Sequence, residues 1–370
     1  MRRALLLVVV LLLATACSED KPQQAQAVIW SQVQLPAEPV VLAGHGEQLL
    51  VGLRDRKAKV VPRLLVIEGD RQSEIKLSPN ASSPYAALAV WKSIAYDGRR
   101  VLALGGAAGG AHSNVRWTVW TGTTSAVQEL PQEFNTFGGP DAGTLYSAVI
   151  APAGQALLGA WASRTSGLDA AVWLPDGTKW IRQDSAGTVL RSTPGLLPGP
   201  GDATVFGDAI VQTGSQVRLA PNVVRQEAAV WTSRRLNDGW SGFALPEAGE
   251  RSHGQRVTCG DKLCTVAGWV EGKLALWQFD PARPDSARRL KGVPDIAVGD
   301  KTPLPPPILE DDQIVQVVAE GNQVKVLRGT DGAWTVRTSD GPTGDVTDAR
   351  LVGSTLYLIA GNTLWKSAAE

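Results

Sequence analysis

Histidine and cysteine are the side chains best suited to nucleophilic, redox or metal chemistry, and this sequence has few of them. The chain contains three cysteines and three histidines, and the histidines (His45, His112 and His253) stand far apart. No HExxH pair, no Cys/His cluster with zinc-ligand spacing and no phosphate-binding P-loop occurs. We therefore expect no metal site and no cofactor.

Two of the cysteines favour a structural role. Cys259 and Cys264 stand in the segment VTCGDKLCTV, a pattern typical of two strands joined by a tight turn. Such a turn could bring the two side chains face to face, and disulfides form in exported proteins rather than in a reducing cytosol. We predict a Cys259–Cys264 disulfide that acts as a structural staple.

The third cysteine, Cys17, follows a segment typical of an export signal. Arg2 and Arg3 precede an apolar run from Ala4 to Ala14. As a helix this run would span about 16 Å, roughly half the hydrocarbon core of a bilayer. Residues 1–16 are therefore predicted to be an export signal rather than a membrane span.

The residues around Cys17 also resemble the lipobox of bacterial lipoproteins. They read Leu13-Ala14-Thr15-Ala16-Cys17, with alanine instead of leucine three positions before the cysteine. The resemblance implies lipidation of Cys17, a polar tether over residues 17–27 and attachment to the cell membrane outside the cytoplasm. The alternative is ordinary cleavage after Ala16 and a freely secreted protein.

Basic side chains gather in four segments that we expect to be loops. Residues 54–63, 105–116, 162–169 and 212–227 carry nine arginines and lysines against three carboxylates. This bias would suit an anionic partner, although simple solvation of loops explains it equally well. The candidate binding residues are Arg54, Arg56, Lys57, Arg116, Arg164, Arg218 and Arg225, together with His112 and with Trp91, which could stack on a ligand or pack in the core.

Carboxylates could support an enzyme instead, because glycoside hydrolysis needs two acidic residues at one site. Asp141, Asp169, Asp202 and Asp295 fall in suitable predicted segments, but nothing in the sequence selects a pair.

A repeated pattern of short strands must position all these candidates. The repeated unit is an apolar strand, a loop and a second strand that ends in a bulky residue. This unit recurs at spacings of 38 to 58 residues, and its bulky residues are Ile67, Trp120, Trp173, Trp231, Trp277, Leu327 and Trp365. Such periods without helical periodicity are typical of β-propellers. We predict an all-β chain with one seven-bladed propeller over residues 28–370.

The seventh repeat lacks a fourth strand, because the sequence ends soon after Trp365. The segment Val28–Pro36 has the composition of a strand and precedes the first repeat. We predict that it becomes the outer strand of the last blade and closes the ring.

Three turns resemble the Asp-boxes of sialidase-like propellers. They are Asp176–Trp180, Asn237–Trp240 and Asp331–Trp334, each with Asp-Gly followed by tryptophan. The resemblance implies a propeller and says nothing of substrate. The Phe/Tyr-Arg-Ile-Pro motif of that family is absent.

These patterns favour a binding function. In a propeller the loops between second and third strands share one face with the blade-to-blade connectors, and here these are the long segments. Long loops on a rigid scaffold commonly carry binding sites. We therefore expect an envelope-anchored, monomeric module that binds an envelope protein or glycan, which could be anionic. The alternatives are a carbohydrate-active propeller enzyme (glycoside hydrolase or lyase) and an assembly scaffold.

With 36 basic and 36 acidic residues, the chain has no net charge with which to hold nucleic acid.

Overall fold

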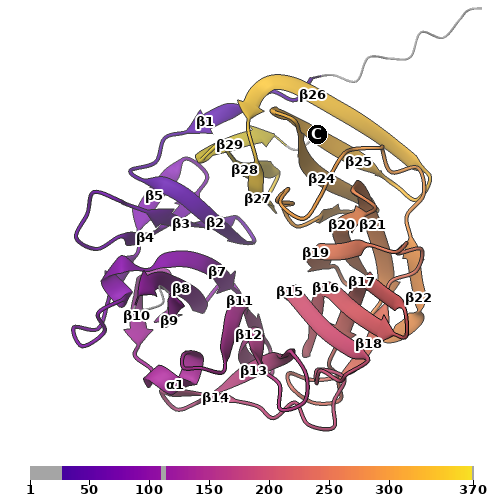
Figure 1. Cartoon of the computed structure of the whole chain (residues 1–370). Helices are drawn as coiled ribbons and strands as arrows, with labels where there is room; N and C mark the ends of the chain where they lie inside the picture. The colour runs from indigo at the N-terminus through magenta and orange to yellow at the C-terminus, as the bar shows by residue number, and fades with distance from the viewer. Residues whose placement is uncertain (1–26, 110–113, 369–370) are drawn as a thin grey trace, which may run out of the picture.

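Seven antiparallel β-sheets follow one another around a central axis, as the blades of one propeller (Figure 1). The computed structural model describes residues 27–109 and 114–368. Each blade has four strands that run in chain order from the axis outwards, with two exceptions: the outer strand of blade 7 comes from the N-terminus, and a short strand that precedes blade 2 in the chain is added to its outer edge. The predicted seven-bladed all-β fold is confirmed.

The strands of each blade are given from the axis outwards. Blade 1 has β2 (Glu38–His45), β3 (Gln48–Arg54), β4 (Pro62–Glu68) and β5 (Arg71–Glu74). Blade 2 has β7 (Val90–Tyr96), β8 (Val101–Gly109), β9 (Asn114–Gly122) and β10 (Ala126–Leu130). Blade 3 has β11 (Ala142–Ala151), β12 (Gly154–Ala162), β13 (Leu168–Asp176) and β14 (Lys179–Arg182). Blade 4 has β15 (Leu196–Phe206), β16 (Ala209–Ala220), β17 (Val223–Thr232) and β18 (Ser241–Ala244).

The remaining blades follow the same plan. Blade 5 has β19 (Ser252–Cys259), β20 (Cys264–Val270), β21 (Lys273–Asp280) and β22 (Arg283–Arg289). Blade 6 has β23 (Ile308–Glu310), β24 (Gln313–Glu320), β25 (Gln323–Thr330) and β26 (Ala333–Thr343). Blade 7 has β27 (Val346–Val352), β28 (Thr355–Ala360), β29 (Thr363–Ala368) and β1 (Ser31–Val33). Two single turns of helix, η1 (Ala86–Leu88) and α1 (Phe134–Phe137), lie in connectors.

The N-terminal strand closes the ring as predicted. β1 pairs antiparallel with β29, and Gln32 lies opposite Trp365. Trp30 packs against the core between blades 6 and 7, while Val33 packs against the core between blades 7 and 1. The segment therefore joins the first blade to the last.

One short segment after blade 1 belongs to the neighbouring blade. The fourth strand of blade 1 is β5, which ends at Glu74. The segment Lys76–Ser78 forms β6 and pairs in parallel with β10, so that it becomes a fifth strand of blade 2. A run of only a few residues can cross to the neighbouring sheet, because the outer edges of adjacent blades lie side by side.

Seven apolar clusters hold the blades together, one at each interface between neighbours. The bulky residue near the end of each third strand always packs in the cluster shared with the preceding blade. These residues are Trp120, Trp173, Trp231, Trp277 and Leu327, with Ile67 at the closing interface and Trp365 against the cluster of blades 6 and 7. The repeated bulky residue of the sequence therefore marks the position that packs between neighbouring blades.

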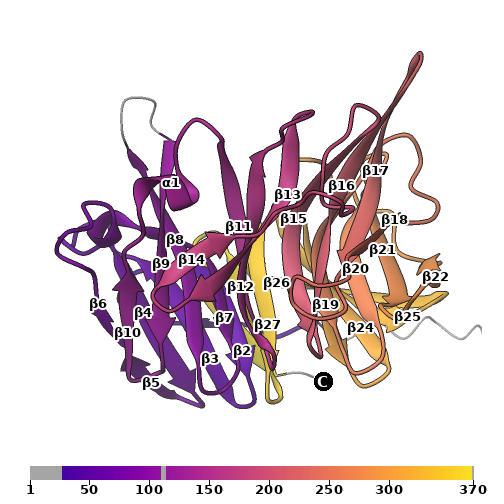
Figure 2. The same cartoon turned by 90° about the horizontal axis from the view of Figure 1, so that it is seen from below.

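The two faces of the ring differ, and Figure 2 shows them from the side. We call the upper side of that view, which carries α1 and the links between second and third strands, the long-loop face. The opposite side carries the short turns between first and second strands, and we call it the tight-turn face. Gly207 in one such turn has φ +56°, a conformation that glycine adopts without strain.

One of the four segments that we expected to be loops is largely β-strand. Residues 212–227 belong to the long hairpin of β16 and β17, which rises above the rest of the long-loop face (Figure 2). Its turn is Pro221-Asn222, and Arg218 lies opposite Arg225 near the tip.

Cys259 and Cys264 form the predicted disulfide across the turn between β19 and β20. Cys264 is fully buried between blades 4 and 5.

Within residues 27–109 and 114–368, no helix has the length and apolar character needed to cross a bilayer. Cys17, the residues 1–16 and most of the expected tether lie outside the described residues.

Candidate functional site

A cavity of about 480 Å³ lies on the propeller axis. Inner strands of the blades line it, together with Pro306 and Pro307, which precede β23. The lining residues come from the middle and the C-terminal ends of these strands, for example Lys92 to Tyr96 of β7 and Asp202 to Val205 of β15. The cavity therefore occupies the half of the channel next to the tight-turn face.

A ring of polar contacts encircles this cavity. Five inner strands carry an irregularity in register that is followed by a polar residue: Ser93, Ser147, Asp202, Arg256 and Asp348. Four of these side chains accept a hydrogen bond from a backbone N–H of the next blade. The donors are Ala148 to Ser93 (3.0 Å), Ala203 to Ser147 (3.1 Å), Val257 to Asp202 (3.0 Å) and Leu42 to Asp348 (2.8 Å).

The sequence gives a faint signal for this ring. Ser93, Asp202 and Asp348 each stand five residues before the glycine of a tight turn, in strands that are otherwise mostly apolar. Apolar Val41 has the same position in β2. Such offsets become informative only when the blade repeat is already aligned, so the sequence alone did not select these residues.

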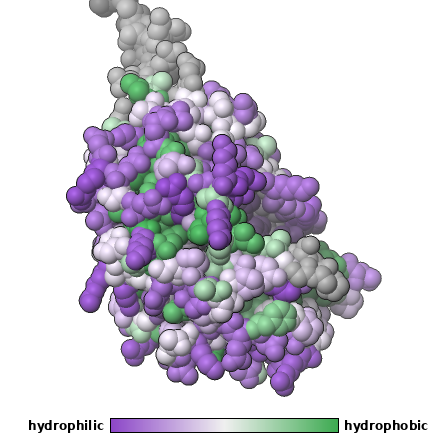
Figure 3. Space-filling view, turned by 90° about the vertical axis from the view of Figure 1, so that its left-hand side faces the viewer, coloured by the Kyte–Doolittle hydropathy of each residue, from purple (hydrophilic) through white to green (hydrophobic). Residues whose placement is uncertain are grey.

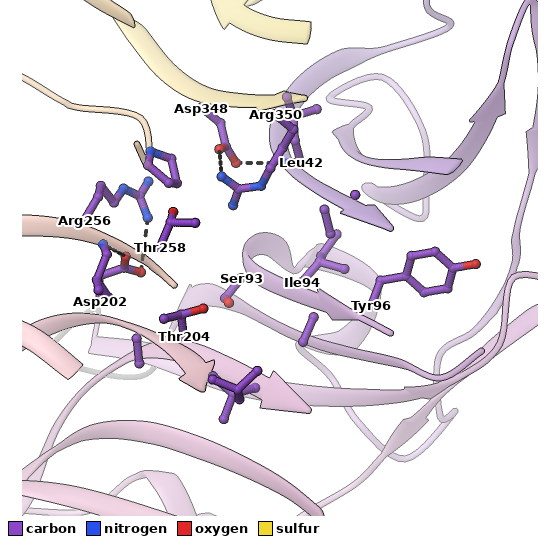
Figure 4. Close-up of a pocket in the computed structure, with 18 of the residues that line it drawn as sticks. Leu42, Ser93, Ile94, Tyr96, Asp202, Thr204, Arg256, Thr258, Asp348 and Arg350 are labelled. Atoms are coloured by element: carbon purple, nitrogen blue, oxygen red, sulfur yellow. Dashed lines mark hydrogen bonds and ion pairs between the residues drawn. The ribbon is translucent and has the colours of Figure 1, made fainter. Parts of the chain in front are cut away.

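Two acid–base pairs face the cavity (Figure 4). Arg256 donates from its Nη1 to Asp202 at 3.5 Å and also donates to the carbonyls of Leu304 (3.0 Å) and Thr347 (3.4 Å). Arg350 lies 3.2 Å from Asp348. Both carboxylates are almost completely buried, with exposed fractions of 8% for Asp202 and 3% for Asp348. Their main contacts are therefore those between neighbouring blades.

Lys92 differs from these pairs. Its side chain lines the cavity, and it forms no ion pair or hydrogen bond with any residue in the described part of the chain. Burial, assisted by the nearby Arg256 guanidinium, holds the pKa of Lys92 below its usual value near 10.5, and Asp202 opposes this effect. The cavity thus contains an ammonium group that is still in contact with solvent and has no fixed counterion in the described part of the chain.

The site does not have the arrangement of a glycosidase. Asp202 is the one predicted acidic candidate that lines the cavity, and Asp348 is a second carboxylate that the sequence did not single out. All their oxygens accept hydrogen bonds from backbone N–H groups, a serine or an arginine, so neither acid is placed to donate a proton. Elsewhere, Asp169 accepts hydrogen bonds from Ser185 and Ser192, Asp295 pairs with Lys273 at the surface, and Asp141 is an exposed connector residue.

A second hollow of about 310 Å³ lies on the long-loop face beside blades 2 and 3. Aromatic side chains contribute to its lining: Tyr85, Trp117, Phe134 and Phe137. Phe134 is 58% exposed, and the Arg116 guanidinium lies 4.6 Å from the centre of its ring. We call this hollow the aromatic groove.

Several predicted basic residues are neutralised by partners in the fold. Arg54 and Arg56 both pair with Glu38, and these contacts lower the pKa of that carboxyl. Arg218 pairs with Glu227 at 3.3 Å. By contrast, the exposed side chains of Lys57, Arg164 and Arg225 form no ion pair within the described part of the chain.

Trp91 packs in the core, which is one of the two places that the sequence left open for it. Its side chain is only 4% exposed, packs edge-on against Trp120 and donates its ring N–H to the carbonyl of Arg63 at 2.8 Å. The register irregularity in β7 turns Trp91 into the interface of blades 1 and 2, while the following Lys92 lines the cavity. His112 lies outside the described residues.

Comparison with solved structures places the chain among β-propellers. YCF48, solved bound to D1 peptide, has 10% identity and a TM-score of 0.56, with 94% of this chain and 96% of that chain covered. Virginiamycin B lyase from Staphylococcus aureus has 10% identity and a TM-score of 0.56, with 92% and 98% covered. The computationally designed Ika8 protein has 13% identity and a TM-score of 0.51, with 89% and 83% covered.

At these identities the likeness shows the fold alone. No family model matches the chain, and no curated protein is significantly similar to it. Function must therefore be argued from the surfaces of this protein.

Proposed function

We propose that this protein is a binding module of the cell envelope, held there through Cys17. Its long-loop face docks a partner protein through an apolar segment flanked by acidic residues. The observation that carries this proposal is the uneven distribution of exposed apolar side chains over the surface.

Eleven large apolar side chains are well exposed among the described residues, and seven of them lie at the long-loop ends of blades 2 to 4 or in the adjoining connectors. Val224 is the most exposed of the seven at 74%. The seven are Leu88, Val115, Phe134, Leu168, Leu219, Val223 and Val224. Apolar side chains gathered on one side of a soluble ring are typical of an interaction surface.

The view of blades 1 and 2 from outside the ring gives a contrast (Figure 3). Polar side chains cover most of that side, with smaller apolar areas set among them. The greater number of exposed apolar side chains on the long-loop face would therefore direct a partner to that face.

The chemistry of the face favours a protein over a glycan. Its exposed side chains are mostly branched aliphatic groups, which suit the apolar side chains of a partner, and the aromatic groove could accept one larger residue. Arg164 and Arg225 stand in the same region without ion-pair partners in the described part of the chain. These two cations would attract an acidic flank.

Two further facts support the proposal. The Cys259–Cys264 disulfide is typical of a protein outside the cytoplasm. YCF48, a propeller of the same fold, has been solved bound to D1 peptide, and so the fold can present a peptide site.

Site-specific photocrosslinking in intact cells tests the docking surface. A benzophenone amino acid is introduced at Val224 or at Phe134, and in parallel at Ile181 of β14 and Val336 of β26, which are exposed apolar positions on outer strands. We expect one discrete crosslinked protein from the long-loop positions and none from the outer strands. Equal products at all four positions would contradict the proposal, as would the absence of a product at Val224 and Phe134.

A charge introduced into the surface provides the matched variant. Val224→Asp should reduce the crosslink from Phe134 about tenfold, because truncation or charging of an interface anchor commonly costs at least about 1.4 kcal/mol. Val336→Asp is the control, and it should leave the crosslink unchanged.

A further inference from the structure

The axial cavity holds more positive than negative charge. Lys92, Arg256 and Arg350 contribute three cations, and Asp202 and Asp348 contribute two carboxylates. Each carboxylate also accepts a hydrogen bond from a backbone N–H of the adjoining blade. The charged side chains that line the cavity therefore have one net positive charge.

Lys92 is the one cation of this cavity that has no counterion in the described part of the chain, because Arg256 pairs with Asp202 and Arg350 pairs with Asp348. It comes from blade 2, whereas Arg256 and Asp202 come from blades 5 and 4. All three side chains line the same cavity, so the folded ring brings Lys92 toward Arg256 from a different blade. Two cations that share a concave site attract an anion more strongly than either does alone. A ligand anion would supply the partner that the described part of the chain does not.

Neutral donors stand beside these charges. Thr204 and Thr258 are half-buried residues of the cavity wall, and Figure 4 shows them near Arg256 and Asp202. Neither hydroxyl forms a hydrogen bond with another residue of the described part of the chain. Both can therefore donate to a bound oxygen atom.

We propose that the axial cavity binds a small organic anion through a carboxylate held between Lys92 and Arg256. The hydroxyls of Thr204 and Thr258 would contact the remaining oxygens. The cavity volume of 480 Å³ falls within the range of about 300–1,000 Å³ that is common for small-molecule sites. Such a ligand would enter from the tight-turn face, so this site is separate from the docking surface on the long-loop face.

Isothermal titration calorimetry on the purified protein tests the site, with citrate and inorganic phosphate as probes at one fixed ionic strength. We expect saturable binding of citrate to a single site. Lys92→Met should weaken that binding about tenfold, because it removes one charge-assisted contact. Lys92→Arg should retain most of the affinity, and circular dichroism will show whether each variant is folded.

Lys76→Met is the matched control. Lys76 is an exposed lysine of β6 at the outer edge of blade 2, without an ion-pair partner in the described part of the chain, and its loss should leave citrate binding unchanged.

The proposal is overturned if citrate does not bind, if folded Lys92→Met binds citrate as the native protein does, or if phosphate binds and citrate does not. The photocrosslink from Val224 reports on the other face and should persist in Lys92→Met. The two proposals can therefore fail separately.

Discussion

Single polar side chains connect the inner strands of this propeller. Asp348 is the clearest case, since one oxygen accepts the N–H of Leu42 at 2.8 Å and the other pairs with Arg350 at 3.2 Å. This contact crosses from the last blade to the first, where the ring closes. A buried N–H that loses its acceptor costs more than the average hydrogen bond contributes.

Asp348→Ala should therefore lower the free energy of unfolding by about 1–3 kcal/mol, because it leaves the N–H of Leu42 unsatisfied. Urea denaturation measures the change. Asp345→Ala, at an exposed position just before β27, is the control and should change stability by less than about 0.5 kcal/mol. Equal effects of the two substitutions would show that the contact contributes little.

At the scale of the element, β1 has an effect larger than its length suggests. It contains three residues, yet it covers the edge of β29 and lies beside Trp30 and Leu35, which pack into the two clusters that flank blade 7. An uncovered edge strand offers unpaired backbone groups to other chains.

Deletion of residues 27–35 should lower the free energy of unfolding by at least about 3 kcal/mol, since each large apolar side chain contributes roughly 1.5–3 kcal/mol on burial. The truncated chain should also self-associate through β29. Denaturation and light scattering measure these two effects. Gln32→Ala is the control, because it keeps the strand and changes an exposed side chain. A monomeric truncated chain with native stability would refute the closing role of β1.

At the scale of the whole molecule, the ring separates two surfaces. The proposed docking surface lies on the long-loop face, and the charged cavity lies in the half of the channel next to the tight-turn face. β1 is the first strand of the chain and lies at the outer edge of blade 7, remote from the axis (Figure 1). An anchor at Cys17 would therefore leave both faces accessible.

Cys17→Ser should move the protein from the membrane fraction to the soluble fraction, because the acyl chains supply about 0.8 kcal/mol per buried methylene. Intact mass spectrometry of the native protein should show a chain that begins at Cys17 with added acyl mass. Cys259→Ala/Cys264→Ala, which keeps Cys17, should remain in the membrane fraction. An unmodified native chain in the soluble fraction would refute lipidation.

Much of the fold could be predicted because the blade is a local unit. The seven bulky ends from Ile67 to Trp365 repeat with the blade, and each packs between blades. The sequence left the outcome open where a residue or segment had two possible neighbours. Lys76–Ser78 pairs with blade 2 rather than blade 1, because the outer edges of the two blades are adjacent. Trp91 could contact a ligand or pack in the core, and the register irregularity in β7 decides its place.

The sequence by itself determined the all-β class, the blade count, the closing strand and the Cys259–Cys264 pair, since each depends on residues near in the chain or on a repeat. Only the tertiary structure placed Lys92, Asp202 and Arg256 around one cavity, because they come from different blades and converge only when the ring closes. The cluster of exposed apolar side chains on blades 2 to 4 also depends on the tertiary structure. Whether a particular leucine or valine is buried depends on which blade covers it.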